Sequence, residues 1–217
     1  MRTIAVVNQK GGCGKRTTAV NLSVAFAKAG RRVLLVDLDP QGHTTMGMGF
    51  DPDSFERTIY DGLIGRGVSV VNVTVGTDVE WLDLVPSNVS LAGAELELQH
   101  AVGKELVLGE WLRTVGDHYD MCIIDCPPAL GLLMINALVA STDVIIPVQV
   151  HFYAFEGLKR LLETIRLLKK RFHPCSARTL GLLLTFVEDR PTYTRRVQLQ
   201  LRELFGDLVF DTVIHKT

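Results

Sequence analysis

The sequence predicts an α/β protein whose twisted, mostly parallel sheet is covered by helices on both faces. Segments rich in Val, Ile and Leu alternate with segments of helical periodicity along all 217 residues. The apolar segments are continuous, a pattern typical of strands that are buried on both faces of a parallel sheet. No linker, repeat or low-complexity stretch interrupts the alternation, so we expect residues 1–217 to form a single domain.

The chain begins with a strand, a glycine-rich loop, a helix and a second strand. Thr3–Asn8 is a short run with β-branched residues and predicts a buried strand. A helix is expected from Lys15, because apolar residues recur at helical spacing, and Gly30 is typical of its C-terminal end. Arg32–Asp39 predicts a second buried strand that ends in acidic residues.

The remaining elements continue the same alternation. Residues 44–67 are Gly-rich and mixed, and they predict short helices and loops. We expect further strands over residues 71–76, 81–87, 120–128, 143–149, 179–187 and 208–214. We expect further helices over residues 90–101, 105–115, 132–141, 155–172 and 193–206.

Composition narrows the class of protein. Lys plus Arg number 23 and Asp plus Glu 24, a net charge of −1, so bulk charge does not predict a protein that coats nucleic acid. Four cysteines show neither a C-x-x-C pair nor metal-ligand spacing and predict buried free thiols of a reducing compartment. The N-terminus lacks a signal-peptide pattern and the apolar runs are too short to span a bilayer, so we expect a cytoplasmic protein.

The stretch QKGGCGKRTT, residues 9–18, lies between the first strand and the first helix and predicts a phosphate-binding loop. The backbone N–H groups of Gly11, Gly12, Cys13 and Gly14 are expected to curl around an anion. The helix that follows points the positive end of its dipole at the same place. The Lys15 ammonium is then expected on the β and γ oxygens of a nucleotide.

One residue of this loop does not fit the general pattern G-x-x-x-x-G-K-[ST]. Arg16 stands where a Ser or Thr hydroxyl would contact magnesium. An arginine side chain offers no lone pair to a cation and stays charged at any working pH. It would repel magnesium, yet it would form an ion pair with a phosphate.

Acidic residues follow two of the predicted strands. Asp37 and Asp39 end the second strand, and Asp125 lies at the end of the run CIID. Because ligands of open α/β sheets bind at the carboxyl ends of the strands, acids in these places beside a phosphate loop favour a nucleotide and magnesium site.

Several stretches resemble the ParA and Soj family of ATPases with a deviant Walker-A loop, within the ParA and MinD group. KGGCGK (residues 10–15) is similar to the signature loop of that group. GRRVLLVDLDPQGHTT (30–45), YDMCIIDCPPALGLLMINAL (119–138) and GLLLTFVEDR (181–190) are similar to further motifs of the family. The resemblance covers essentially the whole chain and implies a P-loop NTPase fold that binds ATP or ADP with Mg²⁺.

The resemblance also implies roles for single residues. Lys10 matches the signature lysine, which reaches the phosphates of a partner subunit in an ATP-dependent homodimer. Asp39 matches the acid that orients the attacking water, Asp37 an acid of the magnesium environment, and Asp125 the Walker-B acid that holds magnesium through water. Thr17 joins Arg16 and the loop residues in the expected nucleotide site.

The implied biology is segregation of chromosome or plasmid DNA. The resemblance implies a dimer that binds DNA non-specifically, at Arg190 among other residues, and that a ParB-type centromere-binding protein releases by triggering hydrolysis. It implies no membrane partner and a cytoplasmic, nucleoid-associated location. Relatives of this family continue through a further strand and helices after the point where TVIHKT ends this sequence. We expect that difference to affect base recognition and DNA affinity.

Arg16 leaves three interpretations open. Thr17 or water replaces the missing hydroxyl and a reduced ATPase activity survives, or the site holds nucleotide without efficient turnover, or Arg16 is a substitution in an otherwise ordinary family member. Impaired hydrolysis with retained nucleotide binding is the preferred interpretation. Two alternative functions also remain at this point: an ATPase that positions a protein cargo, and a nucleotide-binding regulatory scaffold that does not hydrolyse.

Overall fold

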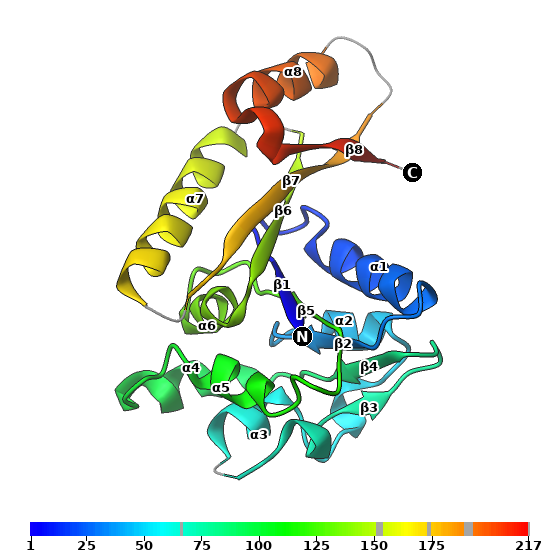
Figure 1. Cartoon of the computed structure of the whole chain (residues 1–217), viewed down its shortest axis with the longest axis vertical. Helices are drawn as coiled ribbons and strands as arrows, with labels where there is room; N and C mark the ends of the chain where they lie inside the picture. Colours follow the sequence, from blue (N-terminus) through cyan, green and yellow to red (C-terminus); the bar gives the residue numbers. More distant parts are fainter. Residues whose placement is uncertain (66, 151–153, 173–174, 189–192, 217) are drawn as a thin grey trace.

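The architecture is that of a mostly parallel sheet with helices on both faces, as the sequence predicts (Figure 1). The computed structural model describes residues 1–65, 67–150, 154–172, 175–188 and 193–216. Its strands are β1 (Arg2–Val6), β2 (Val33–Asp37), β3 (Val75–Gly76), β4 (Leu82–Val85), β5 (Met121–Asp125), β6 (Asp143–Gln149), β7 (Arg178–Val187) and β8 (Val209–His215). Its α-helices are α1 (Lys15–Lys28), α2 (His43–Gly47), α3 (Ile59–Ile64), α4 (Leu91–Glu97), α5 (Val107–Arg113), α6 (Leu132–Ala140), α7 (Ala154–Arg171) and α8 (Tyr193–Phe205).

All eight strands of the described residues belong to one sheet, in the order β3-β4-β2-β5-β1-β6-β7-β8. Every pairing is parallel except that of β3 with β4. The register aligns Val6 of β1 and Asp37 of β2 with Asp125 of β5. The carboxyl ends of these three neighbouring strands therefore meet at one edge of the sheet.

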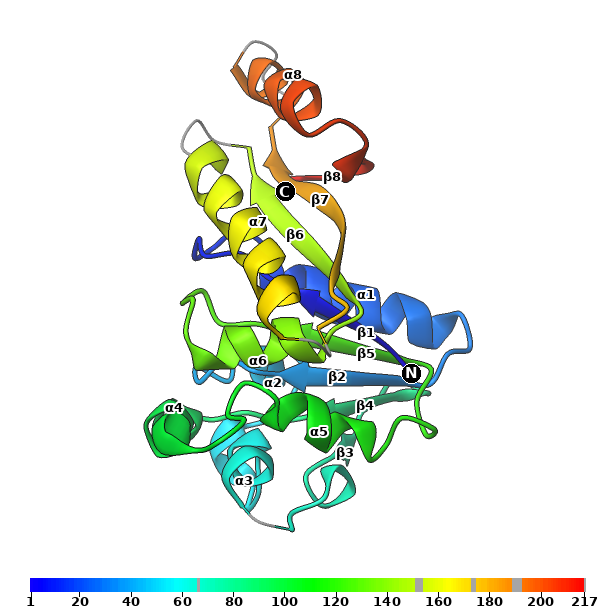
Figure 2. The ribbon, with the colours of Figure 1, turned by 60° about the vertical axis from the view of Figure 1, so that its left-hand side comes forward.

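Alternating side chains of each central strand enter two separate cores. Ile4 and Val6 pack with residues of α1 on one face, whereas Ala5 and Val7 join the larger core under α3 to α7 on the other. Figures 1 and 2 show α6 and α7 on one side of the sheet and α1 on the other. Burial on both faces explains why the central strands are apolar over most of their length, with their acidic residues at or near the strand ends.

The structure corrects part of the predicted element list. Only Val75–Gly76 of the predicted strand over residues 71–76 is extended, and Val70–Asn72 forms a 3₁₀ turn. The Ser69 N–H and hydroxyl both donate to the Asn72 side chain, which closes the turn before a strand can start. The helices expected over residues 90–101 and 105–115 are both shorter in the structure. α4 ends at Glu97 and is followed by a 3₁₀ turn at Leu98–His100, and α5 covers Val107–Arg113.

In the described part of the chain, no helix is both long enough and apolar enough to cross a membrane.

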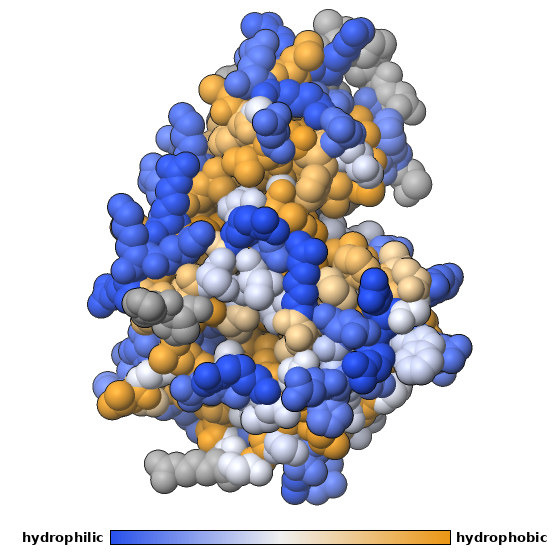
Figure 3. Space-filling view, viewed as in Figure 1, coloured by the Kyte–Doolittle hydropathy of each residue, from blue (hydrophilic) through white to orange (hydrophobic). Residues whose placement is uncertain are grey.

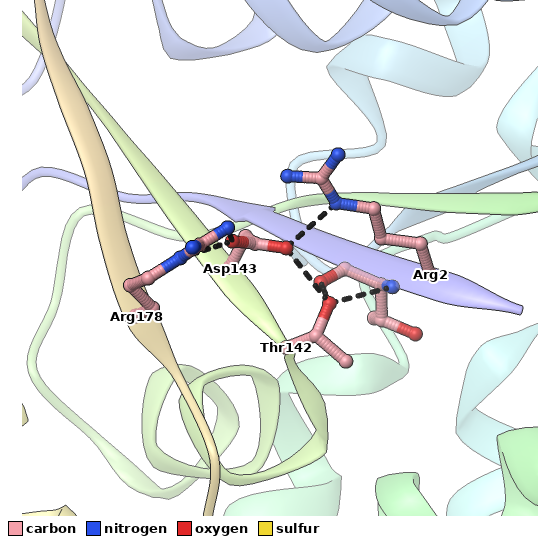
Figure 4. A network of polar contacts seen from close by, with 5 residues as sticks. Arg2, Thr142, Asp143 and Arg178 are labelled. Carbon is pink, nitrogen blue, oxygen red and sulfur yellow. Dashed lines mark hydrogen bonds and ion pairs between the residues drawn. The ribbon is translucent and has the colours of Figure 1, made fainter.

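A buried carboxylate joins three strands at the edge of the sheet opposite the phosphate loop (Figure 4). Asp143, at the start of β6, is 3% exposed. It accepts hydrogen bonds from Arg2 of β1 at 2.7 Å, from Arg178 of β7 at 2.9 Å and from the Thr142 hydroxyl at 3.1 Å. Burial acts to raise the pKa of Asp143, but these donors outweigh it and hold the pKa below its ordinary value.

This network predicts that Asp143→Asn lowers the free energy of unfolding by about 1–3 kcal/mol near neutral pH. A carboxylate whose pKa is depressed in the folded state stabilises the fold above the pKa of the unfolded chain, and that contribution disappears as the pH falls through the folded pKa. Urea denaturation of both proteins between pH 7 and pH 3 should therefore show the difference shrinking in acid. Glu110→Gln, which removes the exposed partner of Arg113, is the matched control and should change stability little. Equal stability of Asp143→Asn and wild type at pH 7 would contradict the prediction.

Candidate functional site

The loop between β1 and α1 forms the floor of a pocket of about 340 Å³. Gly12 and Gly14 have φ angles of 68° and 90°, a left-handed conformation that glycine adopts without strain. Gly14 is also the N-cap of α1, so the helix starts at Lys15 and its free N–H groups point toward the loop. The pocket is lined by Gly11, Gly12, Gly14, Lys15, Arg16, Thr17, Asp39, His43, Asp125, Cys126, Pro128 and Phe186.

Hydrogen bonds from distant strands hold the loop in place. The Thr185 hydroxyl of β7 donates to the backbone carbonyl of Cys13 at 2.9 Å. The Asn8 amide donates to the Pro147 carbonyl of β6 at 2.6 Å and accepts from the Lys10 N–H at 2.9 Å. The Cys13 side chain is fully buried, so this residue can offer only its backbone to a ligand.

The two predicted lysines occupy different environments. Lys15 is 8% exposed, and its Nζ donates to the Lys10 carbonyl at 3.1 Å, so the ammonium lies across the loop. Lys10 is exposed and is not among the described residues that line the pocket. The side chain of Lys10 therefore lies on the surface of the protein, next to the glycine-rich loop.

Asp37 and Asp125 are register partners, yet their carboxylates face different groups. The Thr45 N–H and hydroxyl each donate to one Asp37 oxygen at 2.8 Å, and the Asp39 N–H donates to the other at 3.2 Å. Burial raises the pKa of Asp37, and the Thr45 hydrogen bonds partly offset that effect. Asp37 is not among the described residues that line the pocket. Its hydrogen bonds with Thr45 hold α2 against β2.

Asp125 lines the pocket, and its two carboxylate oxygens differ in their hydrogen bonds. Its Oδ2 accepts a hydrogen bond from the Thr44 hydroxyl at 2.6 Å. Its Oδ1 is buried and has no hydrogen-bond partner among the described residues. Burial raises the pKa of Asp125 to about 7, helped by the charges of Asp37 and Asp39 and opposed by the Thr44 hydrogen bond.

A hydrated divalent cation fits this arrangement. An unpartnered buried carboxylate oxygen is costly unless a cation or a water bound to one satisfies it. Oxygen ligands and retained waters are what Mg²⁺ prefers. Asp39, which follows β2 in the chain, is half-buried and also lines the pocket.

Arg16 and Thr17 lie at the rim, on the first turn of α1. Both residues are exposed and both line the pocket, so an arginine stands beside the loop where the general pattern has a hydroxyl. The Thr18 hydroxyl donates to the Gly14 carbonyl at 2.8 Å, within the first turn of the helix. Thr17 lines the pocket, so of these two threonines it is the one placed to offer its hydroxyl to a ligand.

A second, more apolar cavity of about 700 Å³ adjoins the first. It lies between α1 and strands β7 and β8, and it shares Gly14, Thr17 and Phe186 with the phosphate pocket. Figure 3 shows apolar side chains gathered over β7 and β8 beside the hollow that separates them from α1. The two cavities are therefore neighbours, and the one on the loop has the more polar lining.

Phe186 is a site residue that sequence reasoning missed. Its φ of 54° is left-handed, which is uncommon for a bulky residue and stores strain of order 1–3 kcal/mol. The sequence offers no signal for it, because a positive φ is expected of Gly or Asn rather than Phe. Thr44 and Thr45 were also missed: Thr44 binds Asp125, 81 residues away, and the contact of Thr45 with Asp37 depends on how the chain turns back between β2 and α2.

Arg190, the expected DNA contact, lies outside the described residues. Arg195 and Arg196, which follow it on the first turns of α8, are exposed.

Comparison with known proteins relates the chain to several others. Residues 1–176 match a protein family described as an AAA domain. The chain is 46% identical over 213 residues to the sporulation initiation inhibitor protein Soj of Bacillus subtilis (strain 168), a match that covers 98% of this chain and 83% of that protein. It is 41% identical over 213 residues to the chromosome partitioning protein ParA of Myxococcus xanthus (strain DK1622), covering 98% of this chain and 75% of that one.

A solved structure is also similar over the whole chain. The crystal structure of a Mycobacterium smegmatis protein named cobyrinic acid a,c-diamide synthase, with bound ATP analog and magnesium, matches with a TM-score of 0.93 at 40% identity. The match covers 100% of this chain and 88% of that chain. The predicted resemblance and the predicted fold are both confirmed.

The buried environment of Asp125 predicts that its ionised carboxylate lowers the free energy of unfolding when no ligand is bound. A carboxyl group whose pKa is raised on folding destabilises the folded state above its unfolded pKa, and the penalty is complete above the folded pKa of about 7. In EDTA and without nucleotide, Asp125→Asn should therefore increase the free energy of unfolding at pH 8 by about 2–4 kcal/mol. The gain should vanish below pH 4.

Urea denaturation at pH 4, 6 and 8 measures this effect. Asp117→Asn, an exposed aspartate away from the pocket, is the control and should show no gain that grows with pH. Equal or lower stability of Asp125→Asn at pH 8 would show that the ionised carboxylate of Asp125 does not destabilise the folded chain.

Proposed function

Because the chain belongs to the ParA and Soj family of P-loop NTPases, we propose that it is a nucleotide-switched partition protein that uses ATP and Mg²⁺. The observation that carries the proposal is the phosphate cradle, where the left-handed Gly12 and Gly14, the buried Lys15 and the buried Asp125 all line one pocket. Backbone donors and a lysine suit phosphates, and a carboxylate at the strand ends suits a cation between them.

The proposed position of the nucleotide follows the polarity of the two cavities. The phosphates lie in the polar pocket on the loop, and the base extends past Gly14 and Thr17 into the apolar cavity. Phe186 lines both cavities, and an aromatic ring at this junction suits stacking on a base. Bound Mg²⁺ would neutralise charge that develops on the phosphates during hydrolysis. Asp125 would hold its water shell, and Asp39 would orient the attacking water.

Self-association is the proposed output of nucleotide binding. Two copies would meet across their phosphate pockets, with Lys10 of each copy supplying a cation to the nucleotide of the other. Support comes from the placement of Lys10, whose side chain is exposed beside the cradle and is not part of the lining of its own pocket.

The proposed partners are non-specific DNA and a ParB-type centromere-binding protein. Arginine contacts to phosphates would be salt-sensitive and independent of sequence. Arg195 and Arg196 are exposed on α8, directly after the segment that contains Arg190, which supports this part of the chain as the DNA contact. A ParB-type partner would trigger hydrolysis and so return the chain to its unloaded state.

Arg16 favours a second candidate function, a nucleotide-bound scaffold that hydrolyses slowly. Arg16 lines the phosphate pocket at the sequence position of the expected magnesium-binding hydroxyl. Its positive charge would attract phosphate while opposing the metal. We infer that nucleotide binding is retained and that hydrolysis is reduced.

The effect of Arg16 is tested by restoring the hydroxyl. Arg16→Thr should raise magnesium-dependent ATP hydrolysis by about tenfold or more, because a metal contact is regained and a repelling charge is removed. The measurement is steady-state phosphate release with Mg²⁺, with and without DNA. Arg31→Thr, an exposed arginine at the other end of α1, is the control. Equal rates for wild type and Arg16→Thr would mean that Thr17 or water already replaces the hydroxyl.

The role of Lys10 is tested by separating binding from association. Lys10→Ala should bind a fluorescent ATP analogue within about threefold of wild type, since an exposed residue outside the lining contributes little to its own pocket. It should lose dimer formation in ATP and Mg²⁺, as measured by light scattering after size exclusion. Lys28→Ala, at the far end of α1, should dimerise as wild type does. ATP-dependent dimers of Lys10→Ala would refute the role in trans.

A further inference from the structure

The short helix α2 places two buried hydroxyl groups on two acids of the strand ends. Thr44 and Thr45 are both fully buried. The Thr44 hydroxyl donates to Asp125 of β5 at 2.6 Å, whereas Thr45 binds Asp37 of β2 through both its N–H and its hydroxyl. Neighbouring residues of one helix turn are therefore attached to neighbouring strands.

The two oxygens of Asp125 are in different situations. Oδ2 is held by Thr44, and Oδ1 is buried without a partner in the described part of the chain. Asp125 lines the phosphate pocket, but Thr44 lies behind it and does not. Thr44 is fully buried, so we expect its effect on the site to pass through Asp125.

We propose that Thr44 is a positioning residue, whose hydroxyl fixes Oδ2 of Asp125 so that Oδ1 faces the hydrated Mg²⁺ of the nucleotide site. The proposal rests on the proposed nucleotide-binding function. It assigns to α2 a task that neither the loop nor the acids perform themselves.

The physical basis is the orientation of a carboxylate in a dry environment. A hydroxyl that donates to an ionised oxygen forms a short, charge-assisted hydrogen bond and favours the ionised form. Groups that orient a metal-binding carboxylate are worth a large share of metal affinity. Without the Thr44 donor, Asp125 would lose the hydrogen bond that fixes its rotation and opposes its protonation.

The surroundings of α2 keep the Thr44 hydroxyl in place. Thr45 is bound to Asp37 on one side, and its hydroxyl accepts a hydrogen bond from the Ser87 N–H at 3.0 Å on the other. The Ser87 hydroxyl in turn donates to the Asp39 carbonyl at 2.8 Å. These bonds attach α2 to the ends of β2 and β4, so Thr44 is presented to Asp125 from a fixed support.

The test measures how nucleotide affinity depends on Mg²⁺, using ribose-labelled fluorescent mant-ATP and the full chain. Thr44→Val removes the hydroxyl and keeps the shape. We expect the half-saturating Mg²⁺ concentration to rise about 10- to 100-fold. Affinity in EDTA should stay within about twofold, because Thr44 does not line the pocket. Thr44→Ser, which retains the hydroxyl, should restore the wild-type magnesium dependence.

Two controls separate positioning from a general structural effect. Ser141→Ala removes another buried hydroxyl, which donates to the Ala137 carbonyl at 2.6 Å in α6, and it should leave the magnesium dependence unchanged. In an Asp125→Asn background, Thr44→Val should add no further change, because the acid through which it acts is gone. Thermal unfolding verifies that each variant folds, and Thr44→Ala replaces Thr44→Val if the valine is not accommodated.

The outcomes distinguish the inference from its premise. A wild-type chain that binds no mant-ATP at any Mg²⁺ concentration overturns the proposed function and the inference with it. A wild-type chain that binds mant-ATP equally well with Mg²⁺ and with EDTA overturns the inference alone. So does a Thr44→Val variant with wild-type magnesium dependence, a Thr44→Ser variant as impaired as Thr44→Val, or an effect that adds in full to that of Asp125→Asn.

Discussion

The parallel register of β1, β5 and β2 is the constraint on which the site depends. Because Val6, Asp125 and Asp37 are paired across three neighbouring strands, the phosphate loop and both strand-end acids emerge at one edge of the sheet. The strands are buried on both faces, so this edge is where polar groups can reach a ligand. A shift of one residue in β5 would turn Asp125 away from the pocket and bring an apolar side chain to its place.

That edge brings two buried acids together. Among the described residues, Asp37 has hydrogen bonds to both of its oxygens, whereas Oδ1 of Asp125 has none. The Lys15 ammonium lies on the loop carbonyl rather than on an acid. The strand-end acids and the loop are thus arranged for a ligand that carries both an anion and a cation, and a nucleotide with Mg²⁺ has that composition.

Arg16 changes the balance at the same edge. Arg16, exposed on the first turn of α1, gives the pocket a second cationic residue beside Lys15, and in the proposed function its charge would favour phosphate and oppose the metal. The acids and α2 are unaffected by this substitution, because their hydrogen bonds are made among β2, β4, β5 and α2. The strand-end acids with α2 and the departure at Arg16 therefore concern separable parts of the site, because Arg16 belongs to the loop and first helix and takes no part in those hydrogen bonds.

The sequence by itself determined the fold class, the phosphate loop and the presence of acids at the strand ends, because apolar periodicity, glycine and strand length act locally. Tertiary structure decided which acid faces the pocket, since Asp37 and Asp125 look alike in sequence and differ in the threonines that reach them. It also decided the left-handed Phe186 and the hydrogen bond from Thr185 to Cys13, two residues that are 172 positions apart in the chain. Side-chain hydrogen bonds of that range are set by how the strands pair and pack, and no local pattern encodes them.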